Sequence, residues 1–287
     1  MKRIFEAMAS ASRELFRRWG ALLILLGLYL AMLGAIYLFF VTREATIGQL
    51  VLSLLLALAA PVLFLIIQTM AARYHGGQRA GALLGGSIRD FWKLLVISLP
   101  LLLIVVIAIY VFGKLEPTAP ATAVRDAARA VAAPVPAPAR PAAPTKPQPV
   151  SWQSVAITTL EYLLFCLVLP LAAIHLWIGT AREGVTKTFK QSPRILARAF
   201  SPQSVISYAL GFIVFAVIPY LLVVTKTPAS SAWLDAGLLI ARLVLGAVFS
   251  LVGWVVTIGA MCRLREPGDT ANVAQPSEGT GHVPAEA

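Results

Sequence analysis

The sequence predicts an all-α integral membrane protein with six transmembrane helices. Six apolar runs carry this prediction, at roughly 21–42, 47–70, 92–112, 154–180, 204–225 and 234–262. Each run is long enough to span a bilayer, because a hydrocarbon core about 30 Å thick takes about 20 helical residues to cross. The composition agrees, since 59% of the residues are hydrophobic and only 13% are charged, which is unlike a soluble domain.

The first segment, 1–19, is expected to form an amphipathic helix that lies at the membrane interface. Four large apolar residues recur at helical spacing: Ile4, Met8, Leu15 and Trp19. Five basic residues in the same segment can contact headgroups. A simple cytoplasmic extension of the first span is the alternative. The first membrane half, with spans 1 to 3, then occupies 20–112.

A proline- and alanine-rich linker, 113–152, separates the two membrane halves outside the cytoplasm. It contains nine prolines between Pro117 and Pro149, and proline fixes φ and lacks a backbone donor, so we expect an extended chain. A tether between the halves and an arm that binds a partner both fit this segment. The second half, with spans 4 to 6, occupies 153–265, and the polar tail 266–287 has a composition typical of disorder.

Lysine and arginine are distributed unequally about the spans. Sixteen lie before span 1, within 71–93 and 181–203, or at the end of span 6, whereas seven lie on the opposite side. The positive-inside rule therefore predicts a multi-pass protein of the cell membrane, taken to be a bacterial inner membrane, with both termini cytoplasmic. The net charge is +11, and the basic residues responsible for it flank the membrane segments. This placement favours contact with the bilayer over contact with nucleic acid.

Two basic segments join spans on the cytoplasmic side, and we call 71–93 the first elbow and 181–203 the second elbow. Their arginines are the candidates for contact with anionic headgroups or a partner: Arg73, Arg89, Arg182, Arg194 and Arg198. A membrane-protein partner or a homo-oligomer is compatible with these surfaces. Ser192-Pro193 is expected to start a short helix that ends near Phe200, and Ser201-Pro202 to start span 5 in the same way.

The elbows belong to an internal repeat that the sequence suggests. A shift of 109 residues aligns spans 2 and 3 with spans 4 and 5, with 11 of 45 positions identical. Arg73 then matches Arg182, and Arg89 matches Arg198. Both units enter and leave the cytoplasm in the same sense, so the repeat is parallel rather than inverted.

Two charged side chains lie well inside the apolar runs. Glu161 in span 4 and Arg242 in span 6 are each seven or eight residues from the outer end, a depth of about 11 Å at the helical rise. Charges within a bilayer are costly and usually paired, so equal depth and opposite sign predict an intramembrane ion pair. The pair either locks the two spans together or takes part in a gated or proton-linked transport path.

A stripe of small and polar residues accompanies each charge. Thr158 and His175 share the stripe of span 4, while Ser250 and Thr257 share that of span 6. Small residues allow close approach of helices and hydroxyl groups can bond across the interface, so we expect the stripes to face each other or a shared cavity. His175 is expected to bind a headgroup or a backbone group.

Further polar and helix-bending residues occur near or within the spans. Gln68, near the inner end of span 2, is expected at the membrane interface. Pro61, Pro100, Pro170 and Pro219 lie within spans 2 to 5, where each frees a carbonyl that a neighbour must satisfy.

No catalytic, metal-binding or nucleotide-binding signature is found in the sequence, so we expect neither a cofactor nor an enzyme. The expected function is that of a non-enzymatic membrane protein that organises or assists membrane partners or lipids. The alternative is a small transporter or permease subunit that uses the Glu161–Arg242 pair.

Overall fold

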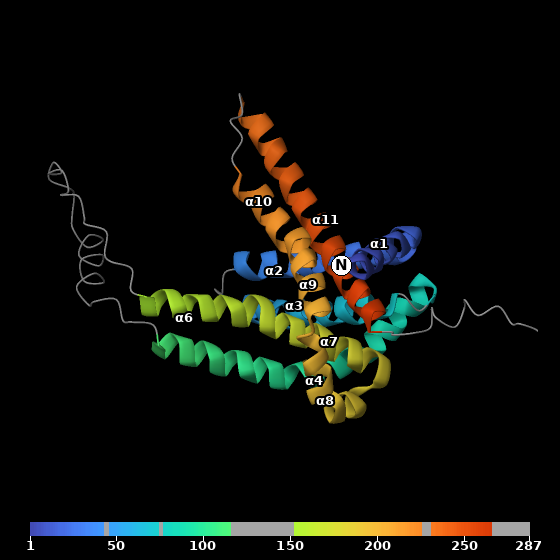
Figure 1. Ribbon diagram of the computed structural model, residues 1–287. Coiled ribbons are helices and arrows are strands. Elements are labelled where there is room, and N and C mark those ends of the chain that lie inside the picture. The colour runs from blue at the N-terminus through green and yellow to red at the C-terminus, as the bar shows by residue number, and fades with distance from the viewer. Residues whose placement is uncertain (43–45, 75–76, 116–151, 226–230, 266–287) are drawn as a thin grey trace, which may run out of the picture. The chain divides into compact units, whose positions relative to one another are not determined.

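A computed structural model describes residues 1–42, 46–74, 77–115, 152–225 and 231–265 (Figure 1). These residues are almost entirely helical, and no strand occurs among them. Six helices are long and apolar enough to cross a membrane: Trp19–Val41, Ile47–Arg73, Ala80–Leu115, Val155–Glu183, Pro202–Val224 and Trp233–Leu264. The predicted all-α membrane fold with six spans is thus confirmed. The linker 116–151 and the tail 266–287 lie outside the described residues.

The chain forms two compact units, Met1–Ile97 with Ile174–Ala287 (unit 1) and Ser98–Ala173 (unit 2). The helices in chain order are α1 (Lys2–Arg17), α2 (Trp19–Val41), α3 (Ile47–Arg73), α4 (Ala80–Leu115), α6 (Trp152–Leu163), α7 (Leu169–Glu183), α8 (Val185–Ala199), α9 (Pro202–Phe212), α10 (Ile218–Val224) and α11 (Ala232–Leu264). Two π-helical segments, η2 (Leu164–Val168) and η3 (Ile213–Val217), join α6 to α7 and α9 to α10.

Side-chain caps define where several helices begin. Thr46 and Gln49 form a reciprocal capping box at the start of α3. Ser231 accepts a hydrogen bond from the backbone of Leu234 at the start of α11. These hydroxyls satisfy backbone donors that have no partner within the first turn of a helix.

The N-terminal helix α1 packs against α11 within unit 1. Its buried face contains Ile4, Ala7, Ala11 and Leu15, while Trp19 already belongs to α2 and is 63% exposed. The apolar face of α1 therefore contacts protein. Its location at a membrane interface stays a prediction.

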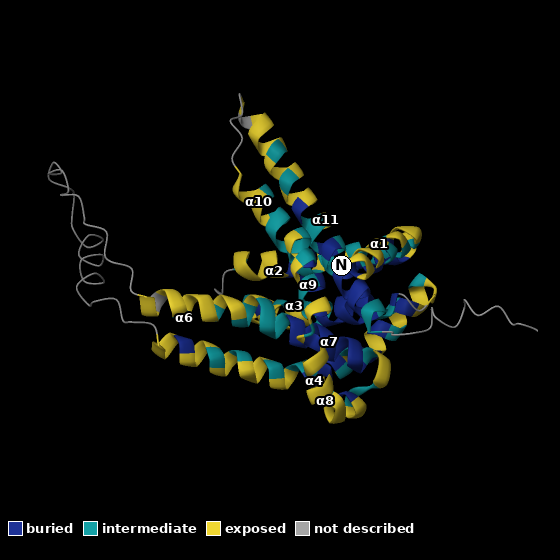
Figure 2. Cartoon of the chain, in the orientation of Figure 1, coloured by how far each residue is buried: buried dark blue, intermediate teal, exposed yellow. Residues whose placement is uncertain are grey.

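The most deeply buried part of unit 1 lies at one end of its spans. Residues 65–72 of α3, 174–180 of α7 and 255–262 of α11 are all buried, and Figure 2 shows them in dark blue. α2 lies alongside α3, and α11 lies alongside α9, η3 and α10. The other ends of α2, α3 and α11 carry mainly exposed apolar side chains, as expected for surfaces in contact with lipid.

Two of the four prolines within spans follow π-helical segments. Pro170 comes two residues after η2, and Pro219 comes two residues after η3, whereas Pro61 and Pro100 lie inside continuous α-helices. Pro219 leaves the carbonyl of Phe215 without its helical donor. That carbonyl accepts a hydrogen bond of 3.0 Å from Ser250 Oγ, so the expectation that neighbours satisfy freed carbonyls is confirmed at this position.

The second elbow differs in part from the prediction. α8 begins at Val185, after Gly184 with φ of 85°, rather than at Ser192-Pro193, which lie inside the helix. A positive φ is accessible to glycine and interrupts the helix at this earlier point. The predicted start of span 5 is confirmed, because Ser201 caps α9 and Pro202 is its first residue.

The internal repeat is not confirmed. In the first elbow α4 continues without interruption from Ala80 into span 3, whereas the second elbow has a break at Phe200 and Ser201 between α8 and α9.

Unit 2 contains the second part of α4, α6, η2 and the start of α7. Phe112 and Phe165 are in ring contact there, with centroids 6.3 Å apart. α4 extends to Leu115, which is three residues beyond the predicted end of span 3.

Candidate functional site: a basic pocket at the second elbow

Within unit 1, the small and polar stripe of span 6 lies against span 5. The expected facing of the stripes of spans 4 and 6 stays a prediction. Arg242 Nη1 donates a hydrogen bond to the carbonyl of Thr225, which ends α10. A cation at the C-terminus of a helix is favoured by the helix dipole and satisfies an unpaired carbonyl. One turn further along span 6, Gly246 lies close to span 5. A Cβ placed on Gly246 would lie 3.8 Å from Pro219 Cα.

The contact surface between spans 5 and 6, which we call the seam, continues toward the other end of span 6. Beyond the hydrogen bond from Ser250 to Phe215, a Cβ on Gly253 would lie 3.1 Å from the Phe215 backbone nitrogen. Thr257 is fully buried and packs directly on Gly211 of α9. The predicted residues Arg242, Ser250 and Thr257 thus hold spans 5 and 6 together.

Glu161 and Thr158 lie on α6 in unit 2, whereas Arg242 lies in unit 1. Glu161 is half-buried and Thr158 is exposed. The Glu161–Arg242 ion pair would join the two units, and it stays a prediction.

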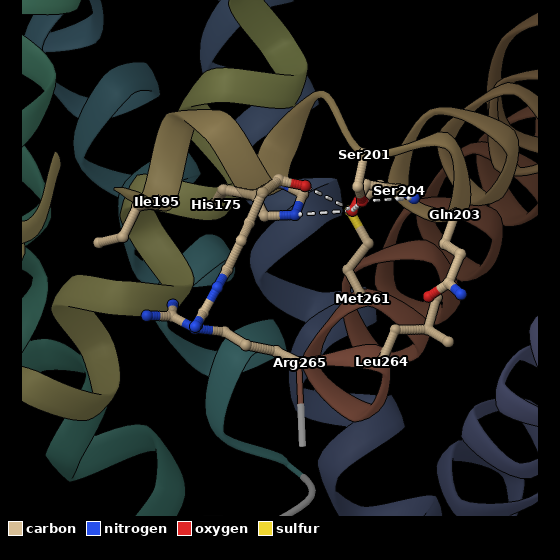
Figure 3. A pocket seen from close by; sticks show the side chains of 9 residues that line it. His175, Ile195, Ser201, Gln203, Ser204, Met261, Leu264 and Arg265 are labelled. Carbon is tan, nitrogen blue, oxygen red and sulfur yellow. Dashed lines mark hydrogen bonds between the residues drawn. The ribbon is translucent and has the colours of Figure 1, made fainter. Parts of the chain in front are cut away.

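A cavity of about 230 Å³ lies where the second elbow meets the end of α11 (Figure 3). Its polar lining comes from α7, α8, the start of α9 and the end of α11: His175, Arg198, Ser201, Gln203, Ser204 and Arg265. Its apolar lining is Ile195, Met261 and Leu264. None of these lining residues is acidic, so the cavity, which we call the basic pocket, is suited to an anion.

His175 forms one wall of the basic pocket. It is 6% exposed, and its Nε2 lies 3.2 Å from Ser204 Oγ. Ser204 Oγ also donates to the carbonyl of Arg198 at 3.2 Å and accepts from Ser201 Oγ at 3.1 Å. His175 therefore contacts a side chain that anchors the start of α9 (Figure 3). The expected contact of His175 with a headgroup or a backbone group stays a prediction.

Arg265 extends from the end of α11 toward the side of the pocket formed by His175 and Ile195 (Figure 3). Its Nη2 donates to Glu183 Oε1 at 2.9 Å. Its Nη1 is buried and has no hydrogen-bond partner in the part of the chain that the structure describes. This nitrogen can therefore donate to an additional acceptor.

The charges around Arg265 are unbalanced. Burial lowers the pKa of the Arg265 guanidinium, and the carboxylate of Glu183 opposes this effect. Two further arginines, Arg182 and Arg198, lie near enough to lower this pKa as well. Arg182 and Arg198 thus add positive charge near the Arg265–Glu183 contact, and a bound anion would be attracted to this charge.

Gly179 on α7 leaves space for this arrangement. A Cβ there would lie 3.2 Å from Ile195 Cδ1 and 3.3 Å from both Arg265 Nη1 and Thr188 Oγ1. A side chain at this position would require these neighbours, Arg265 among them, to shift by a few tenths of an ångström.

At the first elbow, Arg73 serves to hold the fold together. Its Nη1 lies 2.6 Å from Asp90 Oδ2, and its Nη2 donates to the carbonyl of Ala181 at 3.3 Å. Lys93 Nζ lies 2.7 Å from the other oxygen of Asp90. Arg73 therefore links α3, α4 and the end of α7, and this guanidinium is committed to contacts within the protein.

The remaining candidate arginines are exposed. Arg89 lines a shallow cavity of about 430 Å³ together with Arg79 and Gln78. Arg182 and Arg194 are exposed on α7 and α8. Contact of these side chains with headgroups stays a prediction.

The described residues contain no group of three or more His, Cys, Asp or Glu that could hold a metal ion. The site that they do form differs from the predicted polar pair. Sequence reasoning found His175 and Arg198 but missed Arg265, Ser204, Gln203 and Met261. Arg265 was counted only as a charge that sets orientation, and its burial depends on tertiary contacts that no local pattern encodes.

No protein-family model matches the chain, and no match is found among curated proteins or solved structures. The function is therefore inferred from the geometry and the charge of the basic pocket.

Proposed function

We propose that this membrane protein catalyses no reaction and instead organises or assists lipids and membrane partners at its cytoplasmic side. The direct ligand in this proposal is the phosphate group of an anionic lipid, bound in the basic pocket. The observation that carries the proposal is the buried Nη1 of Arg265, which lacks a partner among the described residues and lies near two further arginines.

Phosphate matches the chemistry of this pocket. Guanidinium groups donate strong, charge-assisted hydrogen bonds to phosphate oxygens, and Arg198 and Arg265 line the same cavity. A buried cation without enough acceptors is costly, so an anion that reaches Arg265 Nη1 removes an existing penalty as well as adding contacts.

The apolar part of the lining favours a lipid over a soluble anion. Ile195, Met261 and Leu264 lie beside the polar groups, and the adjoining α9 and α11 are candidate spans. The distribution of lysine and arginine supports a cytoplasmic location of this end, in a bacterial inner membrane with both termini inside. A cytoplasmic leaflet supplies anionic headgroups at this depth.

The first prediction is that Arg198→Gln weakens binding of anionic lipid about tenfold, because one charge-assisted hydrogen bond is lost. Binding of phosphatidylglycerol to the purified full chain can be measured by native mass spectrometry, with phosphatidylcholine as the uncharged reference.

Arg194→Gln is the matched control. Arg194 lies one turn earlier on α8, is exposed, and is not among the residues that line the pocket. It should change the affinity less than twofold although it removes the same charge. Equal losses in both variants would contradict a defined pocket and indicate diffuse attraction by the elbow.

A small transporter or permease subunit is the second candidate. It is favoured by the position of Glu161 three residues before the π-helical segment η2, since π-helical turns within spans often occur at functional sites. Glu161 would then pair with Arg242 and change its charge during transport. Proton flux into proteoliposomes, followed with a pH-sensitive dye, would be abolished in Glu161→Gln while the protein stays folded.

The pairing itself gives the second prediction. Glu161→Gln and Arg242→Met should each destabilise the protein, and the double variant should recover about 2 kcal/mol of the summed loss. Arg242→Met also removes the donor to Thr225, so only the coupling measured by the full cycle reports the pair. Additive losses in thermal unfolding would show that the two residues do not interact.

A further inference from the structure

A second cavity, of about 200 Å³, lies within unit 1 between α2, α3, η3 and α11. Its lining is largely aromatic and apolar and includes Tyr29, Met32, Phe64, Phe215 and Trp254. Each of these residues belongs to a candidate span. We call this cavity the aromatic pocket.

Most polar groups around the aromatic pocket are paired within the protein. Trp254 Nε1 donates to Gln68 Oε1 at 2.8 Å. Ser250 Oγ interacts with the hydroxyl of Tyr29, and it donates a hydrogen bond to the Phe215 carbonyl. No charged side chain lines this pocket, so a charged group is not favoured inside it.

Gln68 is the exception to this pairing. It lines the pocket and is only 1% exposed, and its expected depth near the membrane interface stays a prediction. Its carboxamide oxygen is occupied by Trp254, while its NH₂ group has no hydrogen-bond partner among the described residues. An amide group left unpaired in an apolar environment is unfavourable, and a bound acceptor would remove that penalty.

We propose that the aromatic pocket binds the upper acyl region of a bilayer phospholipid, with an ester carbonyl accepting a hydrogen bond from the NH₂ group of Gln68. The chain then lies among Phe64, Phe215 and Trp254. Gln68 is five residues from the end of α3, about 8 Å along the helix, which is the depth of the boundary between headgroups and acyl chains. The phosphate stays outside the pocket, because no cation lines it.

This assignment does not depend on the proposed binding of anionic lipid at the basic pocket. The ligand here is recognised by its ester and its hydrocarbon chain, so a zwitterionic phospholipid is sufficient. Arg198→Gln should leave this binding unchanged, which separates the two proposals experimentally.

The test uses the full chain in nanodiscs containing phosphatidylcholine with a photoactivatable diazirine on its acyl chain, near the ester. After irradiation, mass spectrometry of peptides should locate label preferentially on 64–68 and 250–254. Gln68→Leu should reduce this labelling about fivefold, as expected for loss of one hydrogen bond. Gln203→Leu, which removes a glutamine from the basic pocket, should leave it unchanged.

A second variant covers the case in which Gln68→Leu fails to fold. Met32→Trp fills the aromatic pocket while keeping Gln68 and Trp254, and it should also reduce the labelling. Label spread evenly over the exposed apolar faces, or unaffected by both variants, would overturn the proposal. Displacement of the label by a soluble quinone but not by unlabelled phosphatidylcholine would overturn the assignment to a phospholipid.

Discussion

The Gly253→Ala variant is expected to lower the free energy of unfolding by about 2 to 3 kcal/mol through overpacking. The added Cβ would lie 2.9 Å from Val214 Cγ1, 3.0 Å from Phe215 Cβ and 3.1 Å from the Phe215 backbone nitrogen. Backbone atoms of η3 cannot move aside as a flexible side chain can. Spans 5 and 6 must therefore separate to accept the methyl group.

Gly237→Ala is the matched control on the same helix. No atom lies within 4 Å of a Cβ placed there, so the higher helix propensity of alanine should leave stability unchanged or raise it by up to about 1 kcal/mol. Thermal unfolding in one detergent compares the two variants directly. Equal stabilities of both variants would show that spans 5 and 6 do not pack through this seam.

Gly211 offers an internal check of the same seam. A Cβ on Gly211 would overlap the hydroxyl of Thr257 and lie 2.7 Å from its Cγ2. Here the obstacle is a side chain, so Thr257→Ala should restore part of the stability lost in Gly211→Ala. No such rescue is available to Gly253→Ala.

The seam shows what periodicity predicts and what it leaves open. The spacing of Arg242, Ser250 and Thr257 correctly indicated a single packed face of span 6. The spacing does not determine which neighbour meets that face, because any span presents apolar and small residues to its partner. The expected facing of the span 4 stripe therefore stays a prediction beside the observed contact with span 5. The short connection between spans 5 and 6 carried the missing information, since consecutive helices joined by few residues usually lie side by side.

The two pockets were not predictable from local patterns for a related reason. Gln68 meets Trp254 across 186 positions in the chain, and Arg265 meets Glu183 across 82. The start of α9 was predictable from the sequence, because the capping by Ser201 and the preference for Pro202 at the first position depend only on residues within one turn. The helix break at Gly184 was not predicted, because the sequence does not reveal that this glycine has a positive φ.

The Arg73–Asp90 contact gives the other large expected effect. Arg73→Gln should destabilise the protein by about 3 kcal/mol, because it leaves a buried carboxylate with only one cationic partner. The side chain of Asp90 is 8% exposed, and Arg73 also donates to the carbonyls of Gly86 and Ala181. Loss of its guanidinium therefore loosens the junction of α3, α4 and the end of α7.

The double variant Arg73→Gln with Asp90→Asn separates the charge from the packing. Removing both charges should recover a large part of the loss, since breaking an ion pair costs more than replacing it. Arg89→Gln is the control, because Arg89 neighbours Asp90 in sequence but is exposed, so it should change stability by less than about 0.5 kcal/mol. If Arg73→Gln and Arg89→Gln unfold at the same temperature, the first elbow is not held by this ion pair, and Arg73 is then available to lipid headgroups as the sequence suggested.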